Sequence, residues 1–192
     1  MKATRTVVLL ALLAAACTTK GENSALVITK VLTSKGTTTA GVTTCPTIAA
    51  GDTEQSFINL GPDNFGQVGL VVDNRIVDPS TQNPLLRTNS ADFLPHQVVA
   101  SYEVLGTGTV NAPATVAAAG DVPSKTAGPV IVPALFPSTF GAAAGGIAAG
   151  TFIRATLHIE GKLSDGSTVK TSEREYLFRS CGATGCAANP CL

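Results

Sequence analysis

A strict alternation of apolar and polar residues over 153–163 constrains the fold more than any other feature of this chain. One face is apolar and the other is polar: Ile153, Ala155, Leu157, Ile159 and Leu163 against Arg154, Thr156, His158, Glu160 and Lys162. A period of two is typical of a half-buried strand. The turn Ser164–Ser167 follows, and its Gly166 is able to take positive φ. We expect Thr168–Arg179 to return as a second strand, which completes a hairpin.

Four further segments have strand character. Gln97–Leu105 alternates in the same way, Ala25–Thr33 is apolar and β-branched, Val68–Val72 is short, and Pro129–Phe136 contains prolines that indicate an edge strand. No stretch after residue 16 sustains helical periodicity over three turns. The sequence therefore predicts an all-β fold, an antiparallel β-sandwich of immunoglobulin-like architecture, as one domain over residues 25–192. The comparison with immunoglobulins is architectural only, because the chain contains no Trp.

Residues 104–153 have an unusual composition. Asp121 and Lys125 are their only charged residues, and Gly, Ala and Pro dominate, most of all in Ala142–Gly150. We interpret the segment as a Gly/Ala/Pro-rich insertion in the sandwich. The favoured interpretation has its apolar parts folded back on the sandwich and a mobile Gly/Ala tip. The alternative is an exposed, mildly apolar loop that contacts a membrane or a partner.

The N-terminus has the pattern of an export signal. Lys2 and Arg5 precede the ten-residue apolar run Val7–Ala16. A membrane-spanning helix needs about 20 residues, so this run is too short to cross a bilayer. A charged start, a short apolar core and small residues before a cleavage point are typical of a secretory signal.

The segment Leu13-Ala14-Ala15-Ala16-Cys17 resembles the lipobox of bacterial lipoprotein precursors, with Ala14 where Leu is usual. The resemblance implies that residues 1–16 are a signal peptide and that Cys17 is lipidated. The alternative is a plain signal peptide with a chance cysteine. Thr18, in place of the Asp that often retains lipoproteins at the inner membrane, favours the outer membrane.

Two or three acyl chains on one cysteine make a stable membrane anchor. Residues 17–24 then form a lipidated tether. Its seven residues Thr18–Ser24 reach at most about 23 Å when fully extended. We therefore expect the domain to lie close to the bilayer surface.

Four other cysteines remain in the mature chain: Cys45, Cys181, Cys186 and Cys191. An even number in an exported protein predicts two disulfides, and all three connectivities remain open. A zinc site is the less favoured alternative, because the spacings are longer than CxxC and no His lies in the cluster. We expect no metal and no cofactor.

Charge argues against nucleic acid as a partner. Cleavage of the signal peptide removes Lys2 and Arg5, so the number of Lys and Arg residues falls from 13 to 11. The mature chain keeps all 13 Asp and Glu residues and is slightly acidic. No basic patch is visible in the sequence.

No catalytic set is evident. Ser167 and Lys170 form a Ser-x-x-Lys, but residues three apart on a strand point to opposite faces, whereas the penicillin-binding family places this motif at a helix start. No GxSxG, P-loop or HExxH sequence occurs. We interpret His158 as a solvated residue on a polar strand face and His96 as a loop residue.

Scattered acidic residues offer two weaker hypotheses. Asp73, Asp78 and Asp92 flank turns and could collect calcium, although Asp is also an ordinary turn residue. Glu173, Arg174 and Glu175 form a charged patch that we interpret as edge protection against sheet-to-sheet pairing.

The leading functional hypothesis is a non-enzymatic, membrane-anchored lipoprotein, a binding or structural accessory module of the cell envelope with an envelope protein as its partner. One alternative is an envelope enzyme or small-ligand carrier whose site forms across distant strands. Another is a subunit of a larger envelope assembly that docks through residues 104–153.

Overall fold

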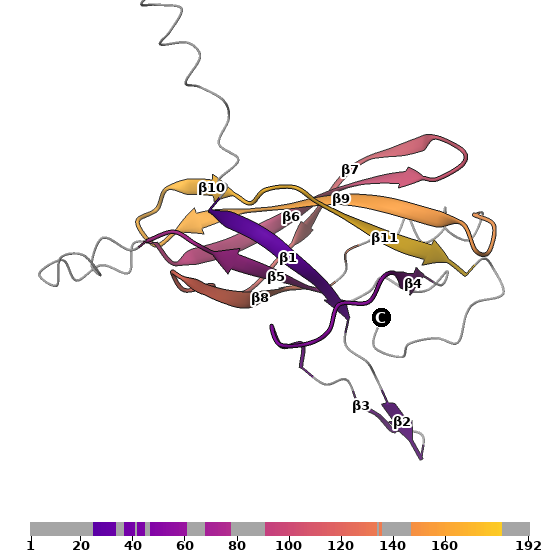
Figure 1. Ribbon diagram of the computed structural model, residues 1–192, viewed down its shortest axis with the longest axis horizontal. Helices are drawn as coiled ribbons and strands as arrows, with labels where there is room; N and C mark the ends of the chain where they lie inside the picture. The colour runs from indigo at the N-terminus through magenta and orange to yellow at the C-terminus, as the bar shows by residue number, and fades with distance from the viewer. Residues whose placement is uncertain are drawn as a thin grey trace, which may run out of the picture.

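The computed structural model describes residues 25–33, 37–40, 42–44, 47–60, 68–77, 91–133, 135 and 147–181. These ranges contain eleven strands and no helix, and two of their sheets pack together (Figure 1). The predicted all-β sandwich is therefore confirmed. Over the same ranges, no helix is long and apolar enough to span a membrane.

The larger sheet has six strands. Along the sheet they are β4 (Ile58–Leu60), β11 (Arg174–Ser180), β9 (Phe152–Leu163), β6 (Phe93–Val104) and β7 (Thr109–Ala117), with β10 (Thr168–Lys170) also paired to β9. The pairs are antiparallel except β4 with β11, which run parallel. The predicted antiparallel arrangement thus holds everywhere in this sheet but at the β4 edge.

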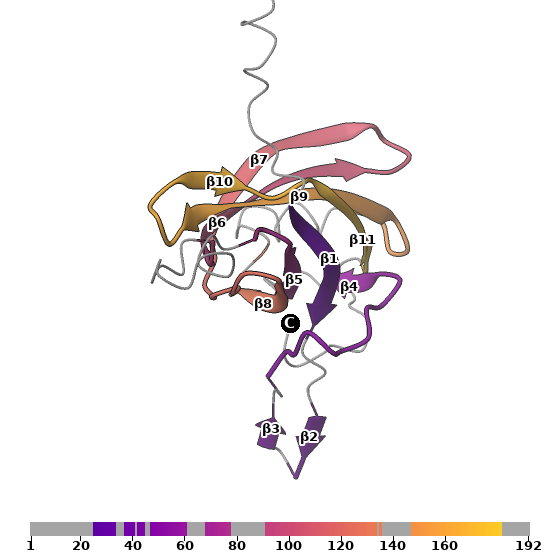
Figure 2. The same cartoon turned by 60° about the vertical axis from the view of Figure 1, so that its left-hand side comes forward.

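The smaller sheet has three antiparallel strands, in the order β1 (Leu26–Thr33), β5 (Val68–Asn74) and β8 (Thr126–Val132). It lies against one face of the six-stranded sheet (Figure 2). A separate two-stranded ribbon of β2 (Thr37–Thr39) and β3 (Val42–Thr44) projects from the body of the sandwich.

The core fills the space between the two sheets. The alternation in β9 places four side chains in it with no exposed surface: Ile153, Ala155, Leu157 and Ile159. Residues from Leu26 to Phe178 contribute to this one apolar cluster. The hydroxyl of buried Tyr102 donates to the Leu135 carbonyl at 2.7 Å, so its polar end is satisfied inside the core.

The predicted hairpin is present, but its return strand is interrupted. Gly166 has φ of 89° in the turn, as expected. Thr171 then interrupts the ladder: its side-chain oxygen accepts from the Ile159 N–H at 3.0 Å, and its own N–H donates to the Ile159 carbonyl at 2.9 Å. The single strand predicted for Thr168–Arg179 is therefore wrong, because this buried Thr separates β10 from β11.

Residues 104–153 are not simply an insertion, which corrects our expectation. Their first part forms β7 of the larger sheet, and β8 belongs to the smaller one. The expectation that apolar parts pack on the sandwich is confirmed by the fully buried Val122, Val130 and Val132. Pro129 lies in β8 at the edge of its sheet, as predicted. Most of Ala142–Gly150 lies outside the described residues, so its mobile tip stays a prediction.

One of the predicted disulfide cysteines falls within the described residues. Cys181 is buried, its N–H donates to the Leu60 carbonyl at 2.9 Å, and it is disulfide-bonded. The other cysteines, Cys17, Cys45, Cys186 and Cys191, lie outside the described residues. Lipidation and disulfide connectivity therefore stay predictions.

Candidate functional site

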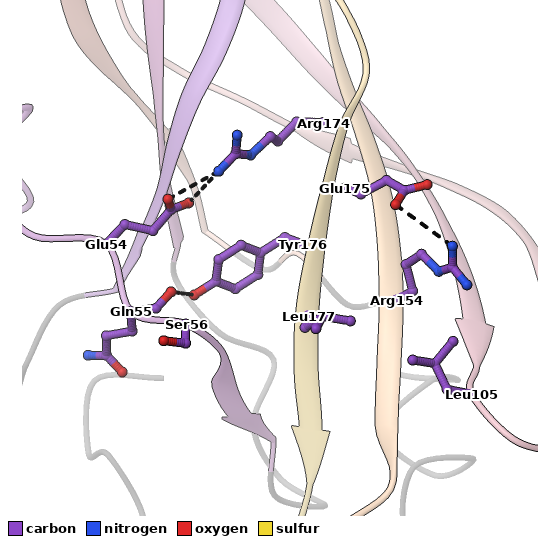
Figure 3. A pocket seen from close by; sticks show the side chains of 9 residues that line it. All are labelled: Glu54, Gln55, Ser56, Leu105, Arg154, Arg174, Glu175, Tyr176 and Leu177. Carbon is purple, nitrogen blue, oxygen red and sulfur yellow. Dashed lines mark hydrogen bonds and ion pairs between the residues drawn. The ribbon is translucent and has the colours of Figure 1, made fainter.

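The polar side chains predicted for one face of β9 lie on the face of the six-stranded sheet that points away from the core. We call this surface the outer face. Two pockets involve it, and we name them after one lining residue each. The Arg154 pocket has a volume of about 470 Å³ (Figure 3). The His96 pocket has a volume of about 340 Å³.

Residues distant in the sequence build the Arg154 pocket. They are Glu54, Gln55, Ser56, Leu105, Arg154, Arg174, Glu175, Tyr176 and Leu177. One edge of β11 pairs with β9, and its other edge pairs with β4 only at Phe178–Ser180. At residues 174–177 no described strand pairs with this second edge. The parallel pairing of β4 positions the preceding segment 54–56 beside this part of β11. The pocket therefore forms where the strand ladder stops.

Arg154 lies between two carboxylates on neighbouring strands. Its guanidinium is 3.0 Å from Glu103 of β6 and 3.8 Å from Glu175 of β11. Glu103 is directly opposite Arg154 in the ladder, which brings the shorter pair together. These side chains are more than a third exposed, so each pair contributes little to stability. They place the Arg154 guanidinium between the two carboxylates.

Glu54 joins the two sheets. Its carboxylate oxygens accept from the Arg174 guanidinium at 3.1 and 3.2 Å, and one of them also accepts from the Val31 N–H at 2.8 Å. Arg174 belongs to the larger sheet and Val31 to the smaller one. Glu54 therefore links the two sheets through one carboxylate. We call Glu54, Arg174 and Val31 the Glu54 clasp.

Tyr176 supplies a fixed hydrogen-bond donor at the same pocket. Its hydroxyl donates to the Gln55 carbonyl at 2.6 Å (Figure 3). Burial raises the pKa of Tyr176 above its usual value, and the negative charge of Glu54 raises it further. The phenol is therefore neutral at physiological pH and cannot act there as a base.

The His96 pocket surrounds a β-bulge. The register of β6 against β9 shifts between Pro95 and Gln97, and His96 lies exposed at this shift. Our interpretation of His96 as a loop residue is wrong, because β6 begins at Phe93 and the bulge accommodates Pro95 within the strand. Gly161 faces the bulge from β9.

Glu160 is held by a neighbour in this pocket. It accepts from the Gln97 amide at 2.6 Å, and this hydrogen bond is the main cause that lowers the pKa of Glu160. His158 Nε2 lies 3.5 Å from the same carboxylate. His158 is on the outer face, as predicted, but its side chain is only 18% exposed and is thus less solvated than expected.

The Ser-x-x-Lys residues have ordinary structural positions. The Ser167 hydroxyl donates to Asp165 within the turn, and Lys170 lies in β10. Glu173, Arg174 and Glu175 flank the uncovered part of β11, where Arg174 pairs with Glu54. Edge protection by this patch stays a prediction.

The acidic residues considered for calcium have other partners. Asp73 pairs with Arg75 at 2.7 Å, and Asp92 accepts from the Ser124 N–H at 3.0 Å. Asp78 lies outside the described residues. Within the part of the chain that the structure describes, no group of three His, Cys, Asp or Glu could hold a metal ion.

Sequence reasoning did not single out the residues of the Arg154 pocket as a group. Arg154 belongs to the polar face predicted for residues 153–163, but Glu54 and Leu105 belong to no motif. A strand-by-strand alignment of β6, β9 and β11 would have brought Glu103, Arg154 and Glu175 together. No signal in the sequence places segment 54–56 beside them, because that depends on the parallel pairing of β4. Comparison of the chain with protein-family models, curated proteins and solved structures gives no match in any of the three.

Proposed function

We propose that this protein is a lipid-anchored lipoprotein of the bacterial cell envelope, attached through Cys17 to the outer membrane, and that it is a non-enzymatic binding or structural accessory module. We further propose that the Arg154 pocket is its binding site. The charge pattern of the N-terminus and the lipobox resemblance support the anchor. β1 begins at Leu26, nine positions after Cys17, and a short tether between them is part of the proposal.

The observation that carries the binding role is the internal pairing of the charged groups around the pocket. Arg154 is paired with Glu103 and Glu175, and Arg174 with Glu54. Ion-paired groups on neighbouring strands present a defined pattern of charge. Such a pattern beside the exposed Leu177 is suited to recognition of a partner.

Labelling in cells tests the anchor. We expect the full-length chain to incorporate labelled palmitate and to fractionate with outer membranes. The Cys17→Ser variant should lose the label and no longer fractionate with outer membranes. A label that persists in the Cys17→Ser variant, or a full-length chain that takes up no label, would refute lipidation at this residue.

Photo-crosslinking tests the binding role. A photoreactive amino acid at Leu177 lies in the pocket, and one at Val42 gives an exposed control on the separate β2–β3 ribbon, since these side chains are 37% and 67% exposed. We expect a discrete crosslinked envelope protein from position 177 and none from position 42. Equal crosslinking from both positions, or turnover of an envelope substrate by the purified protein, would refute the proposal.

A small-ligand carrier is the second candidate, favoured by the volume of the Arg154 pocket. Ligand pockets span about 300–1,000 Å³, and this one falls within the range. Native mass spectrometry of protein purified from its own envelope distinguishes the two functions. A carrier retains a small molecule that the Leu177→Glu variant loses, whereas an accessory module shows the protein mass alone.

A further inference from the structure

The first strand enters the sandwich at a defined end. The Ala25 carbonyl accepts from the Arg75 N–H at 2.7 Å, and the Leu26 carbonyl accepts from the Ser172 N–H at 2.9 Å. These bonds hold the start of β1 between residues of the smaller and the larger sheet. We call this part of the molecule the Ala25 end.

Several other segments meet at the Ala25 end. Leu26 pairs with Asn74, whose side-chain amide donates to the Ala91 and Val122 carbonyls at 2.8 and 3.0 Å. The Ser164 N–H of the β9–β10 turn donates to the Asp92 carbonyl at 3.0 Å. The start of β1 lies beside β10, and its other end lies beside β4 (Figure 1).

The Arg154 pocket lies toward the opposite end. Lys162 of the His96 pocket and Arg154 are eight positions apart on β9, or about 26 Å at 3.3 Å per residue. Leu105, which also lines the Arg154 pocket, donates its N–H to the Phe152 carbonyl at 2.9 Å, where β9 begins. The β6–β7 turn follows directly after it.

We infer that the Ala25 end faces the bilayer in the anchored protein, so that the Arg154 pocket lies at a distance from the membrane. The inference rests on the proposed lipidation of Cys17. Ala25 follows Cys17 by eight positions. A chain of eight residues reaches at most about 26 Å when fully extended.

The reversed orientation requires a nearly fully extended tether. Placing the other end of β1 against the bilayer requires the tether to run back along the whole strand. Eight residues of β1 span about 23 Å, and the β6–β7 turn adds to this distance. The tether would then be held close to full extension, which few of its conformations allow.

The side chains at the Ala25 end also suit a headgroup surface. Val77 and Leu94 are large apolar side chains that are each 43% exposed. Leu94 lies opposite the exposed Lys162 in the ladder, and lysine next to apolar surface is favoured at membrane interfaces. The bilayer surface is therefore the partner that we assign to this end.

Two leucines give a matched pair of reporters. Leu94 and Leu177 are both exposed residues of the larger sheet, 43% and 37% respectively, and they lie opposite Lys162 and Arg154 in the ladder. A fluorescent amino acid replaces one of them in the full-length lipidated protein. The protein is then reconstituted in phosphatidylcholine vesicles whose headgroups carry a nitroxide quencher.

We expect quenching at position 94 to exceed quenching at position 177 by at least threefold. Inserting sixteen Gly/Ser residues after Ser24 should reduce that ratio toward one. Equal or greater quenching at position 177, or a ratio that the longer tether leaves unchanged, would overturn the inference. Flotation of the same samples separates the two proposals, because a protein that does not float with the vesicles refutes the lipid anchor itself.

Discussion

Gly161→Ala should destabilise the protein severely, because β9 passes very close to the bulge of β6 at this point. A Cβ atom at residue 161 would overlap the Leu94 carbonyl oxygen, and it would lie 2.7 Å from Phe93 Cε2 and 2.9 Å from Pro95 Cα. Two of these three contacts are with backbone atoms. They cannot move aside by a rotamer change, so the β6–β9 ladder itself must shift.

The size of the effect follows from opposing contributions. Replacing Gly by Ala in a strand ordinarily stabilises by about 0.5–1 kcal/mol, because the unfolded chain loses freedom. Overpacking a rigid site costs about 1–3 kcal/mol and sometimes more. Because the Cβ atom would overlap backbone atoms, the cost of Gly161→Ala lies at or above the upper end of this range. We therefore expect a net loss of about 3 kcal/mol in the free energy of unfolding. For a domain of this size that corresponds to a fall in Tm of about 6–12 °C.

Gly51→Ala is the matched control. A Cβ atom at Gly51 meets nothing within 4 Å, so we expect a change in the free energy of unfolding within about 0.5 kcal/mol of wild type. Urea denaturation followed by circular dichroism measures both variants. A Gly161→Ala protein as stable as Gly51→Ala would refute the close approach of β9 to the bulge.

Two further predictions concern polar groups. Glu54→Ala removes the shared acceptor and leaves the N–H of the buried Val31 unpaired, which should lower the free energy of unfolding by about 2 kcal/mol. Substitution of the exposed Glu173 by Ala should change the free energy of unfolding by no more than about 0.5 kcal/mol, and equal losses in the two variants would contradict the Glu54 clasp. Gln97→Leu removes the main cause of the lowered pKa of Glu160. A carboxyl group whose pKa is lowered in the folded state stabilises the fold at pH values above its ordinary pKa of 4.5, and this contribution is lost as the pH falls through the folded-state pKa. The variant should therefore be less stable than wild type at pH 7, and the difference in stability should shrink progressively below pH 4.5. A difference that stays constant from pH 7 to pH 3 would contradict this assignment.

The strands that could be predicted are those whose two faces have different environments. β9 separates the core from solvent along its full length, so its alternation is visible in the sequence. β6 is similar over its second half. Of β7 and β8, the sequence predicts only the Pro129–Val132 part of β8, because Gly, Ala and Pro weaken the same signal. Their apolar residues still pack in the core, but small side chains give little contrast between the two faces of a strand.

Bulges and strand order could not be predicted from the sequence alone. Thr171 interrupts a ladder by hydrogen bonding to Ile159, and nothing local distinguishes it from other threonines in strands. The bulge before Gln97 depends on the close passage of Gly161. The parallel pairing of β4 with β11 joins segments about 120 residues apart, and it brings Glu54 to the pocket.

The residues that line the Arg154 pocket differ in how far they also support the fold. Glu54 and Arg174 join the two sheets, and Tyr176 is buried with its hydroxyl bonded to Gln55, so substitutions there change stability and binding together. Leu177 is different, because its side chain is 37% exposed and lies outside the core cluster. A change at Leu177 can therefore alter binding while the sandwich stays intact. Loss of a partner in that variant at unchanged Tm would assign recognition to the pocket, whereas the same loss in a Glu54 variant would not separate recognition from folding.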